Sequence, residues 1–272
     1  MRAEHGLDRA AVDVVRWQTG HPVHQVQDEL AIEEPLEIRV RGRAISVTMR
    51  TPGHDAELAV GFLLSEGLIA TPADVIGAEH CGRDDLGNVL NVLLAPDVYV
   101  NFERLTRHVF ASSSCGVCGK ATIDAIGSMF PPVMSDARIR PQAILAMPDA
   151  MRASQQMFSR TGGIHAAALF DSSGRLLVSR EDVGRHNAVD KVLGYALLHN
   201  LLPLDQHVLL VSGRSSFEIL QKALSARVAI VAAVSAPSSL AVQFAQESGQ
   251  TLIGFLRDAR MNIYTHAHRV EM

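Results

Sequence analysis

The 272-residue chain has few cysteines, few aromatic residues and no long apolar run. Its three cysteines are too few for the disulfide framework of a small secreted domain. The longest apolar run, residues 228–234, is far shorter than a membrane-spanning helix requires. The N-terminus mixes charges of both signs and shows no apolar signal-peptide segment. These absences predict a cytoplasmic protein in a reducing compartment, with no membrane partner.

The chain also lacks an excess of charge of one sign. Charged residues make up 20% of it, hydrophobic residues 47%, and the formal net charge is −4. This composition is typical of a globular protein, and the length predicts one or two domains. Nucleic-acid-binding domains are usually strongly basic, so the composition predicts no nucleic-acid partner.

The sequence pattern changes near residue 110. Residues 1–34 are polar and are predicted to form an N-terminal arm or loop. Alternating apolar and polar residues over 36–40 and 44–49 predict a β-hairpin. A helix from Asp55 that stops at Gly67 and a strand at 89–94 complete a small α+β domain, residues 35–110.

Residues 111–272 are predicted to form an α/β domain in which strands alternate with helices. The predicted strands are 164–170, 176–179, 208–211, 228–234, 252–256 and, less regularly, 261–264; the predicted helices begin at Pro148, His186, Ser215 and Ser238 or Ser239. Glu218 is predicted to complete a capping box with Ser215. This alternation predicts a mainly parallel, three-layer α-β-α sheet in which the opening hairpin makes one antiparallel pair. The order of elements is that of the cytidine-deaminase-like fold, which does not carry its function with it.

The zinc chemistry of deaminases is not supported by the sequence. Those enzymes need a His-x-Glu at one helix start and a Pro-Cys-x-x-Cys at the next. The corresponding segments here, residues 181–186 and 213–218, hold no cysteine. We therefore expect no structural metal and no zinc-bound hydroxide.

Three loops between strands and helices are instead rich in small and hydroxylated residues: 184–185, 212–216 and 235–239. Such loops meet in one crevice of an open α/β sheet, where helix N-termini bind phosphate. Four arginines are placed to add bidentate contacts: Arg185, Arg214, Arg257 and Arg260. The alternative is that serine and glycine merely cap the helices; three loops together with arginines favour a phosphorylated or nucleotide-like ligand.

Two histidines and an acidic pair near these loops have simpler interpretations. His165 starts a strand and is most simply a core or edge residue. His186, at a helix N-terminus, opposes the helix dipole when charged, so it is a candidate neutral proton acceptor. Glu181 and Asp182 most simply supply negative charge to the start of the same helix.

Cys115 and Cys118 form the one Cys-x-x-Cys of the chain, among glycines and serines and next to Lys120. A cysteine on an accessible loop at a helix start, with a cation close by, is partly thiolate and therefore nucleophilic. A structural zinc site needs a second pair of ligands that the spacing does not supply, and Cys81 is interpreted as incidental. The pair therefore indicates sulfur chemistry.

Six segments in this order resemble the formate dehydrogenase accessory sulfurtransferases, the FdhD family. They are residues 51–67, 113–120, 162–165, 181–191, 212–218 and 235–239. The resemblance implies a homodimeric carrier on which Cys115 and Cys118 take persulfide sulfur from a cysteine desulfurase. It implies transfer of that sulfur to Mo-bis(molybdopterin guanine dinucleotide), or its tungsten counterpart, before formate dehydrogenase receives the cofactor.

The resemblance also implies a cofactor-binding segment, Phe255, Leu256, Arg257, Asp258, Ala259 and Arg260. The crevice argument adds Arg214, Ser215, Ser216 and Ser238, and predicts GDP as a ligand that mimics one end of the cofactor. Cys115 is expected to hold the persulfide and Cys118 to relay it, because the N-terminal cysteine lies closer to free N–H groups. Two alternatives stay open: a cofactor-binding chaperone without chemistry, and a thiol–disulfide oxidoreductase.

Overall fold

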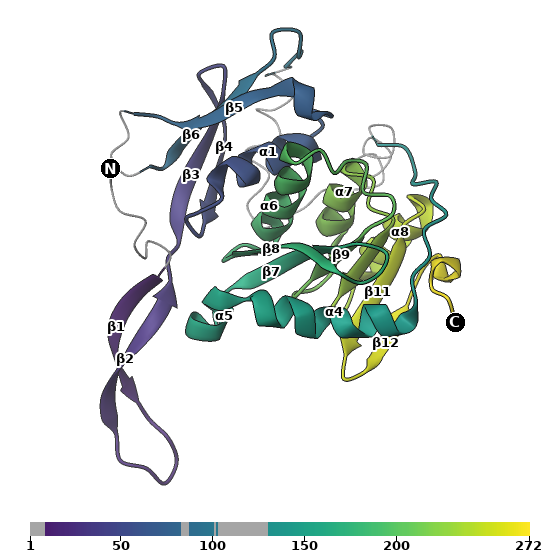
Figure 1. Ribbon diagram of the computed structural model, residues 1–272. Helices are drawn as coiled ribbons and strands as arrows, with labels where there is room; N and C mark the ends of the chain where they lie inside the picture. The colour runs from purple at the N-terminus through teal and green to yellow at the C-terminus, as the bar shows by residue number, and fades with distance from the viewer. Residues whose placement is uncertain (1–8, 83–86, 101, 103–129) are drawn as a thin grey trace.

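The computed structural model describes residues 9–82, 87–100, 102 and 130–272. Over these residues the chain is a mixed α/β protein with three sheets of two, four and six strands. The four-stranded and six-stranded sheets lie in the body of the molecule, and the two-stranded sheet projects from it (Figure 1). No helix in the described part of the chain is both long and apolar enough to span a membrane.

The projecting sheet is an antiparallel hairpin of β1 (Arg9–Arg16) and β2 (His24–Ala31). We call it the arm. Residues 1–34 were predicted to form an arm or a loop, and for residues 9–31 the structure shows an arm and not a loop. The segment is polar on average, but valines recur in it at the two-residue period of a strand. None of the residues in β1 and β2 is buried.

The four-stranded sheet has the order β4-β3-β6-β5. Its strands are β3 (Glu34–Val40), β4 (Arg43–Arg50), β5 (Val75–His80) and β6 (Val89–Leu94). The predicted hairpin and the strand at 89–94 are confirmed, whereas β5 was not predicted. The helix α1 (Asp55–Ser65) ends where Gly67 adopts a positive φ of 70°, as its predicted C-terminal stop requires. A short 3₁₀ helix, η1 (Pro72–Asp74), leads into β5.

The six-stranded sheet has the order β12-β11-β10-β9-β7-β8. Its strands are β7 (His165–Phe170), β8 (Leu176–Asp182), β9 (Val208–Val211), β10 (Ile230–Ala233), β11 (Thr251–Arg257) and β12 (Arg260–Ile263). The prediction of a mainly parallel sheet is wrong: only the β9–β10 and β10–β11 pairs are parallel, and three pairs are antiparallel. The reason is that β7 runs against both neighbours and β11 returns through a tight turn into β12.

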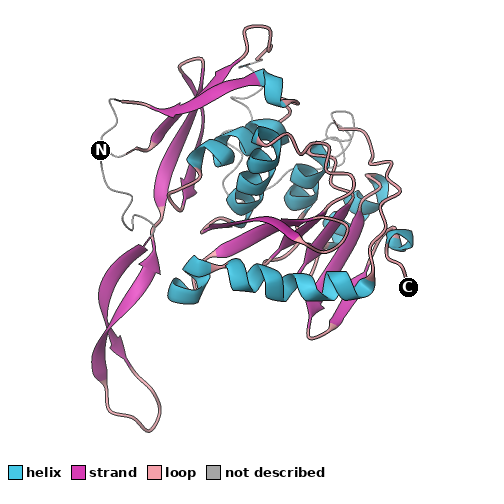
Figure 2. Cartoon of the chain, in the orientation of Figure 1, coloured by secondary structure: helices cyan, strands magenta, loops and turns pink. Residues whose placement is uncertain are grey.

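The helices of this unit are α4 (Pro141–Ser154), α5 (Gln156–Thr161), α6 (Arg185–Leu198), α7 (Phe217–Ser225) and α8 (Ser239–Glu247); η2 (Ala267–Arg269) is a 3₁₀ turn near the C-terminus. Helices α6, α7 and α8 cover one face of the six-stranded sheet and α4 the other (Figure 2). The prediction that Pro148 begins a helix is wrong: Pro141 holds the first position and Pro148 lies inside α4.

Helix α1 joins the two larger sheets because it packs tightly on α6. A Cβ atom on Gly61 would lie 1.8 Å from the carbonyl oxygen of Asp190, and one on Gly194 would lie 1.8 Å from that of Glu57. The two helices therefore cross backbone to backbone, which only glycine allows at these positions. One continuous apolar core runs across this crossing, from Leu36 in β3 to Leu252 in β11.

Candidate functional site

The loops that follow β9 and β10 lie side by side at one edge of the six-stranded sheet, next to the last residues of β11. Ser215 and Pro237 form a parallel β-bridge, and the Ser238 N–H donates to the Ser215 carbonyl at 3.0 Å. The Phe255 N–H donates to the Ser235 carbonyl, also at 3.0 Å. The predicted meeting of the loops 212–216 and 235–239 is therefore confirmed, and we call the place where they meet, beside β11, the crevice.

The antiparallel course of β7 brings a further pair of residues to the crevice. His165 begins β7 beside the end of β9, and Arg185 begins α6 after β8. A Cβ atom added to Gly213 would lie 3.5 Å from Nδ1 of His165 and 3.9 Å from Cδ of Arg185, so both side chains lie against this glycine. His165 is thus part of the crevice, which its simpler interpretation as a core or edge residue did not anticipate.

An ion pair connects the starts of α6 and α7. Nε2 of His186 lies 2.9 Å from Oε2 of Glu218. The predicted capping box is consequently wrong: the N-cap of α7 is Ser216, which makes no side-chain cap bond, and the Glu218 carboxylate is held by His186. The hydrogen bond with His186 lowers the pKa of Glu218, so this carboxylate is negative at neutral pH.

The electrostatics of the crevice keep His165 neutral. Burial lowers the pKa of His165, and its neighbours Arg185 and His186 lower it further, against the smaller opposite effect of Asp182. A neutral imidazole can accept or donate one hydrogen bond at each nitrogen. His165 therefore offers a polar contact without adding charge.

Two buried polar atoms of the crevice have no partner. In the described part of the chain, the buried side-chain atoms without a hydrogen bond are Ser179 Oγ, Arg185 Nε, His207 Nδ1 and Ser215 Oγ. Leaving a buried donor unpaired costs about 1–3 kcal/mol, so such groups usually meet a ligand, an ion or water. Two of the four, Arg185 Nε and Ser215 Oγ, lie near helix starts of the crevice, where backbone N–H groups and the helix dipole favour an anion.

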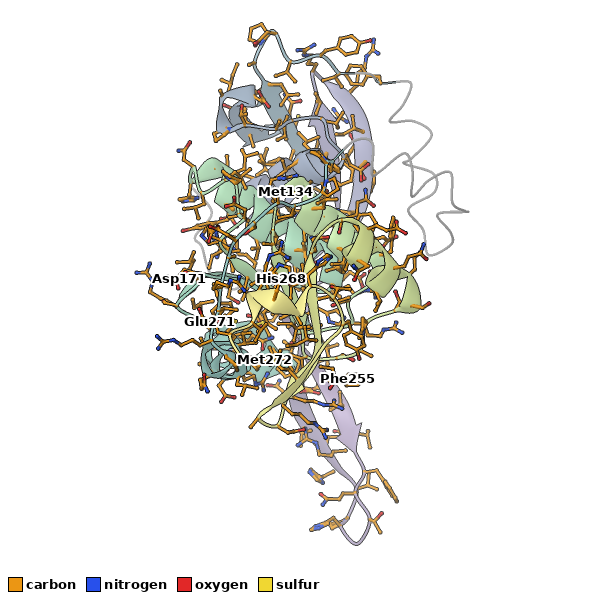
Figure 3. The ribbon with its side chains drawn as sticks, turned by 90° about the vertical axis from the view of Figure 1, so that its right-hand side faces the viewer. Met134, Asp171, Phe255, His268, Glu271 and Met272 are labelled. Atoms are coloured by element: carbon orange, nitrogen blue, oxygen red, sulfur yellow. The ribbon has the colours of Figure 1, made fainter. Side chains whose placement is uncertain are left out.

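The turn between β11 and β12 has an unusual backbone. Phe255, Asp258 and Ala259 all have positive φ, of 52°, 52° and 55°. A bulky residue in this region is rare and costs on the order of 1–3 kcal/mol, and such residues cluster at ligand sites. Phe255, labelled in Figure 3, is part of β11.

The side chains of this segment differ in their accessibility. Arg257, Asp258, Ala259 and Arg260 are exposed, with both arginines within 3.9 Å of the Asp258 carboxylate. Leu256, in contrast, is buried in the core. Leu256 is therefore not available to a ligand at the turn.

The serines and Arg214 also divide by exposure. Arg214 and Ser238 are exposed, Ser216 is half-buried and Ser215 is buried. Ser238 caps α8 as predicted, because its Oγ accepts from the Ala241 N–H at 3.2 Å. Capping accordingly accounts for Ser238, but not for Ser215 or Ser216.

The acidic pair before α6 has a different role from the one predicted for Glu181. Its carboxylate accepts the N–H groups of Met157 and Phe158 at 2.9 and 2.8 Å, so it caps α5. Asp182 does serve the start of α6, since its Oδ1 accepts the Gly184 N–H at 2.8 Å.

Asp182 also forms a buried cluster with Thr51 and Lys191. Lys191 Nζ lies 2.7 Å from Asp182 Oδ2, which accepts the Thr51 N–H at 3.2 Å. Thr51 Oγ1 accepts the Val183 N–H, and its carbonyl accepts from Lys191 Nζ at 2.9 Å. All three polar groups of Thr51 therefore hold the segment that begins α6, a role that no local sequence signal indicated.

Cys115, Cys118 and Lys120 lie outside the described residues. Cys81 follows β5, and its N–H donates to the Val89 carbonyl at 2.9 Å. In the ranges that the structure describes, no group of three or more histidine, cysteine or acidic side chains could hold a metal ion.

Comparisons with known proteins point in one direction. The FdhD/NarQ family model matches residues 31–271. "Sulfur carrier protein FdhD" of Mycobacterium tuberculosis is 53% identical over 266 residues, which cover 94% of this chain and 96% of the relative. The protein of the same name from Streptomyces avermitilis is 49% identical over 267 residues, 95% of this chain and 94% of the relative.

A solved structure agrees at the level of the fold. The crystal structure of a proposed formate dehydrogenase accessory protein from Desulfotalea psychrophila matches with a TM-score of 0.76 and 24% identity. The match covers 97% of this chain and 99% of the other. At that identity the likeness supports the fold, and the argument for the family comes from the sequence relatives.

Proposed function

The chain belongs to the FdhD/NarQ family, and from this membership we propose that it is a sulfur carrier for the maturation of formate dehydrogenase. The observation that carries the proposal is identity of about half the residues, over nearly the full length, with proteins named sulfur carrier protein FdhD. In this proposal the chain accepts persulfide sulfur from a cysteine desulfurase. It passes the sulfur to a molybdenum or tungsten bis-guanine-dinucleotide cofactor, which is its substrate. The reaction is placed in the cytoplasm.

The two cysteines carry the sulfur. The Cys115 thiolate attacks the outer sulfur of the desulfurase persulfide, a sulfur–sulfur bond forms on Cys115, and the desulfurase cysteine leaves as a thiolate. Cys118 then relays the sulfur or resolves the persulfide.

The crevice binds the cofactor through its guanosine diphosphate ends. The unpaired Nε of Arg185 and Oγ of Ser215 support this assignment, as do the positive-φ residues of the β11–β12 turn. Arg214, Arg257 and Arg260 are exposed at the rim, where guanidinium groups can pair with phosphate. The strand order, with β7 antiparallel to β9, supports a cytidine-deaminase-like scaffold for this crevice.

The test is mass spectrometry of the full chain after incubation with a purified cysteine desulfurase and cysteine. We expect an adduct of one sulfur atom on the peptide that spans residues 112–120. Replacement of Cys115 by Ala should abolish the adduct, whereas Cys118→Ala should still load sulfur but transfer it poorly. Loading of the Cys115→Ala variant and not of the Cys118→Ala variant would reverse the order of the two cysteines.

The same variants separate the proposal from its two alternatives. A chaperone without chemistry would still activate formate dehydrogenase in cells after both cysteines are replaced. A thiol–disulfide oxidoreductase would reduce insulin disulfides, which a sulfur carrier does not need to do. Either result would contradict the proposal, and GDP binding should survive both cysteine replacements.

A further inference from the structure

His165 lies where three elements of the crevice meet. It is the first residue of β7, which lies between β8 and β9 in the six-stranded sheet (Figure 1). The loop after β9 is fixed beside it, because the Ser212 N–H donates to the Ala166 carbonyl and the Ser212 hydroxyl accepts from the Ala166 N–H, both at 2.9 Å. Nδ1 of His165 lies against Gly213 in this loop, and the side chain of Arg185 reaches the same glycine. The imidazole is thus held at a defined place in the crevice.

The ring nitrogens of His165 have no partner in the described part of the chain. The side chain is half-buried, and neither nitrogen forms a hydrogen bond with a described residue. Neither nitrogen is among the fully enclosed polar atoms that lack a partner, so the ring is open to solvent and to a ligand. A neutral imidazole donates one hydrogen bond, whereas a protonated one donates from both nitrogens. Since an ionised phosphate only accepts hydrogen bonds, the protonated ring is the better partner for it.

Three charged or titratable groups of the described chain face His165: Asp182 on β8, and Arg185 and His186 at the start of α6. Asp182 is already paired with Lys191, at 2.7 Å, and His186 with an acidic side chain of α7, at 2.9 Å. Arg185 is half-buried and forms no ion pair with a described residue. Its guanidinium is therefore the uncompensated charge of this group, and it favours an anion next to His165.

The protonation of His165 depends on what occupies this place. Without a ligand, burial lowers the pKa of His165, Arg185 and His186 lower it further, and Asp182 opposes them more weakly. A phosphate bound beside Arg185 brings negative charge next to the ring and stabilises its protonated form. The pKa of His165 must then rise on binding, so the ligand and a proton bind together.

We propose that His165 is a ligand-binding residue of the crevice, which takes up a proton from water when a phosphate group binds beside Arg185 and then donates a hydrogen bond to that phosphate. The ligand class is a fully ionised phosphate ester or anhydride, such as the diphosphate of a guanine nucleotide. The inference rests on the proposed function, because it concerns the same crevice. Since binding consumes a proton, the crevice must bind such a ligand more tightly as the pH falls and release it as the pH rises.

The experiment is calorimetric titration of the full chain with GDP, in two buffers of different ionisation enthalpy near about pH 7. The dependence of the heat on the buffer gives the number of protons taken up. We expect the wild-type chain to take up protons and His165→Gln to take up fewer. Between about pH 8 and about pH 6, the affinity of the wild-type chain relative to this variant should rise about three- to tenfold, as for a pKa raised by roughly one unit.

The comparison with the variant also removes the contribution of the ligand. A terminal phosphate itself ionises at about pH 6, and this ionisation is common to both proteins and cancels in the difference between them. The matched control is His21→Gln, which removes an exposed imidazole from the turn of the arm and should behave as wild type at every pH.

Several outcomes would overturn the proposal. An affinity loss in His165→Gln that is equal at low and high pH would show a structural or uncharged contact. Proton uptake that survives in His165→Gln and disappears in His186→Gln would assign the proton to His186 instead. Absence of proton uptake by the wild-type chain would contradict the proposal without any variant. Failure of GDP to bind would remove the phosphate site as well, whereas sulfur loading on the cysteines would still test the sulfur-carrier function by itself.

Discussion

Two regions lie next to each other around α6: its contact with α1, and the crevice at its first residues. They differ in whether their polar side chains have partners within the chain. In the contact, the charges of Asp182 and Lys191 are buried and paired with each other, and Asp190 is paired with Lys222 at 2.8 Å. In the crevice, Arg185 has an unpaired nitrogen and His165 is neutral. Polar residues that look equally functional in the sequence therefore have two roles. Those whose side chains are paired within the chain stabilise the fold, and those without a partner can bind a ligand.

Lys191 offers the strongest test of the structural half of this comparison. Replacing it with Met removes the partner of Asp182, which is fully buried, and we expect a loss of about 3–5 kcal/mol in the free energy of unfolding. Urea denaturation measures the loss. The control is Arg175→Ala, which removes an exposed ion pair with Asp171 and should cost less than about 1 kcal/mol. Equal losses in the two variants would contradict the structural role of Lys191.

The helix crossing should be nearly as sensitive. Gly194→Ala places a Cβ atom against the backbone of α1, so the helices must separate, at an expected cost of about 3 kcal/mol. Gly163→Ala is the control, because its Cβ atom would meet nothing closer than 3.8 Å. Thermal unfolding followed by circular dichroism should show a lower melting temperature for the first variant only.

The crevice should respond in binding and not in stability. Arg260→Ala removes an exposed guanidinium from the β11–β12 turn, and we expect GDP binding to weaken by about 1.5–3 kcal/mol, the range of a charge-assisted hydrogen bond. Arg214→Ala should behave in the same way. Calorimetric titration with GDP measures the affinity, and no GDP binding by the wild-type chain at millimolar concentration would argue against the phosphate site.

The smallest effect is a pH dependence located at the α1–α6 contact. Burial would raise the pKa of Glu57, but hydrogen bonds from Arg180 and His54 lower it to about 2, from an ordinary value of 4.5. Because the folded pKa is the lower one, this stabilisation is present above pH 4.5 and is lost as the pH falls toward 2. Glu57→Gln should therefore be less stable than wild type at neutral pH, by up to about 2 kcal/mol, and equally stable near pH 2. A difference between the two that does not shrink in acid would contradict this assignment.

Much of the fold follows from local patterns, and each prediction that failed can be traced to a particular strand or residue. The buried runs 208–211 and 228–234 and the helix at 186–199 were predictable because burial and helical periodicity leave clear signals. The direction of β7 was not, since strand pairing depends on contacts between distant residues. Likewise Pro148 looked like a helix start, but the helix tolerates it in its interior.

The candidate site divides in the same way. The meeting of the loops that hold Ser215 and Ser238 was predictable because strand ends of an α/β sheet lie at one edge. The ion pair of His186 with Glu218 was not predictable, because it joins two different helices and no spacing in the sequence indicates it. The family resemblance supplied the role of the Phe255–Arg260 segment, and the backbone of Phe255 supplies a physical reason to look there.

The glycine crossing also bears on how such a chain can change over generations. Gly61 faces the backbone of Asp190, and Gly194 faces that of Glu57, so neither position can accept a side chain unless both helices shift. Thr51 is tied in the same way to Asp182 and Lys191. We expect these positions to be inherited as a block, with residues 51–61 and 182–194 exchangeable between relatives together but not separately. A chimera that takes only one of the two segments from a distant relative should fold poorly, and one that takes both should fold well.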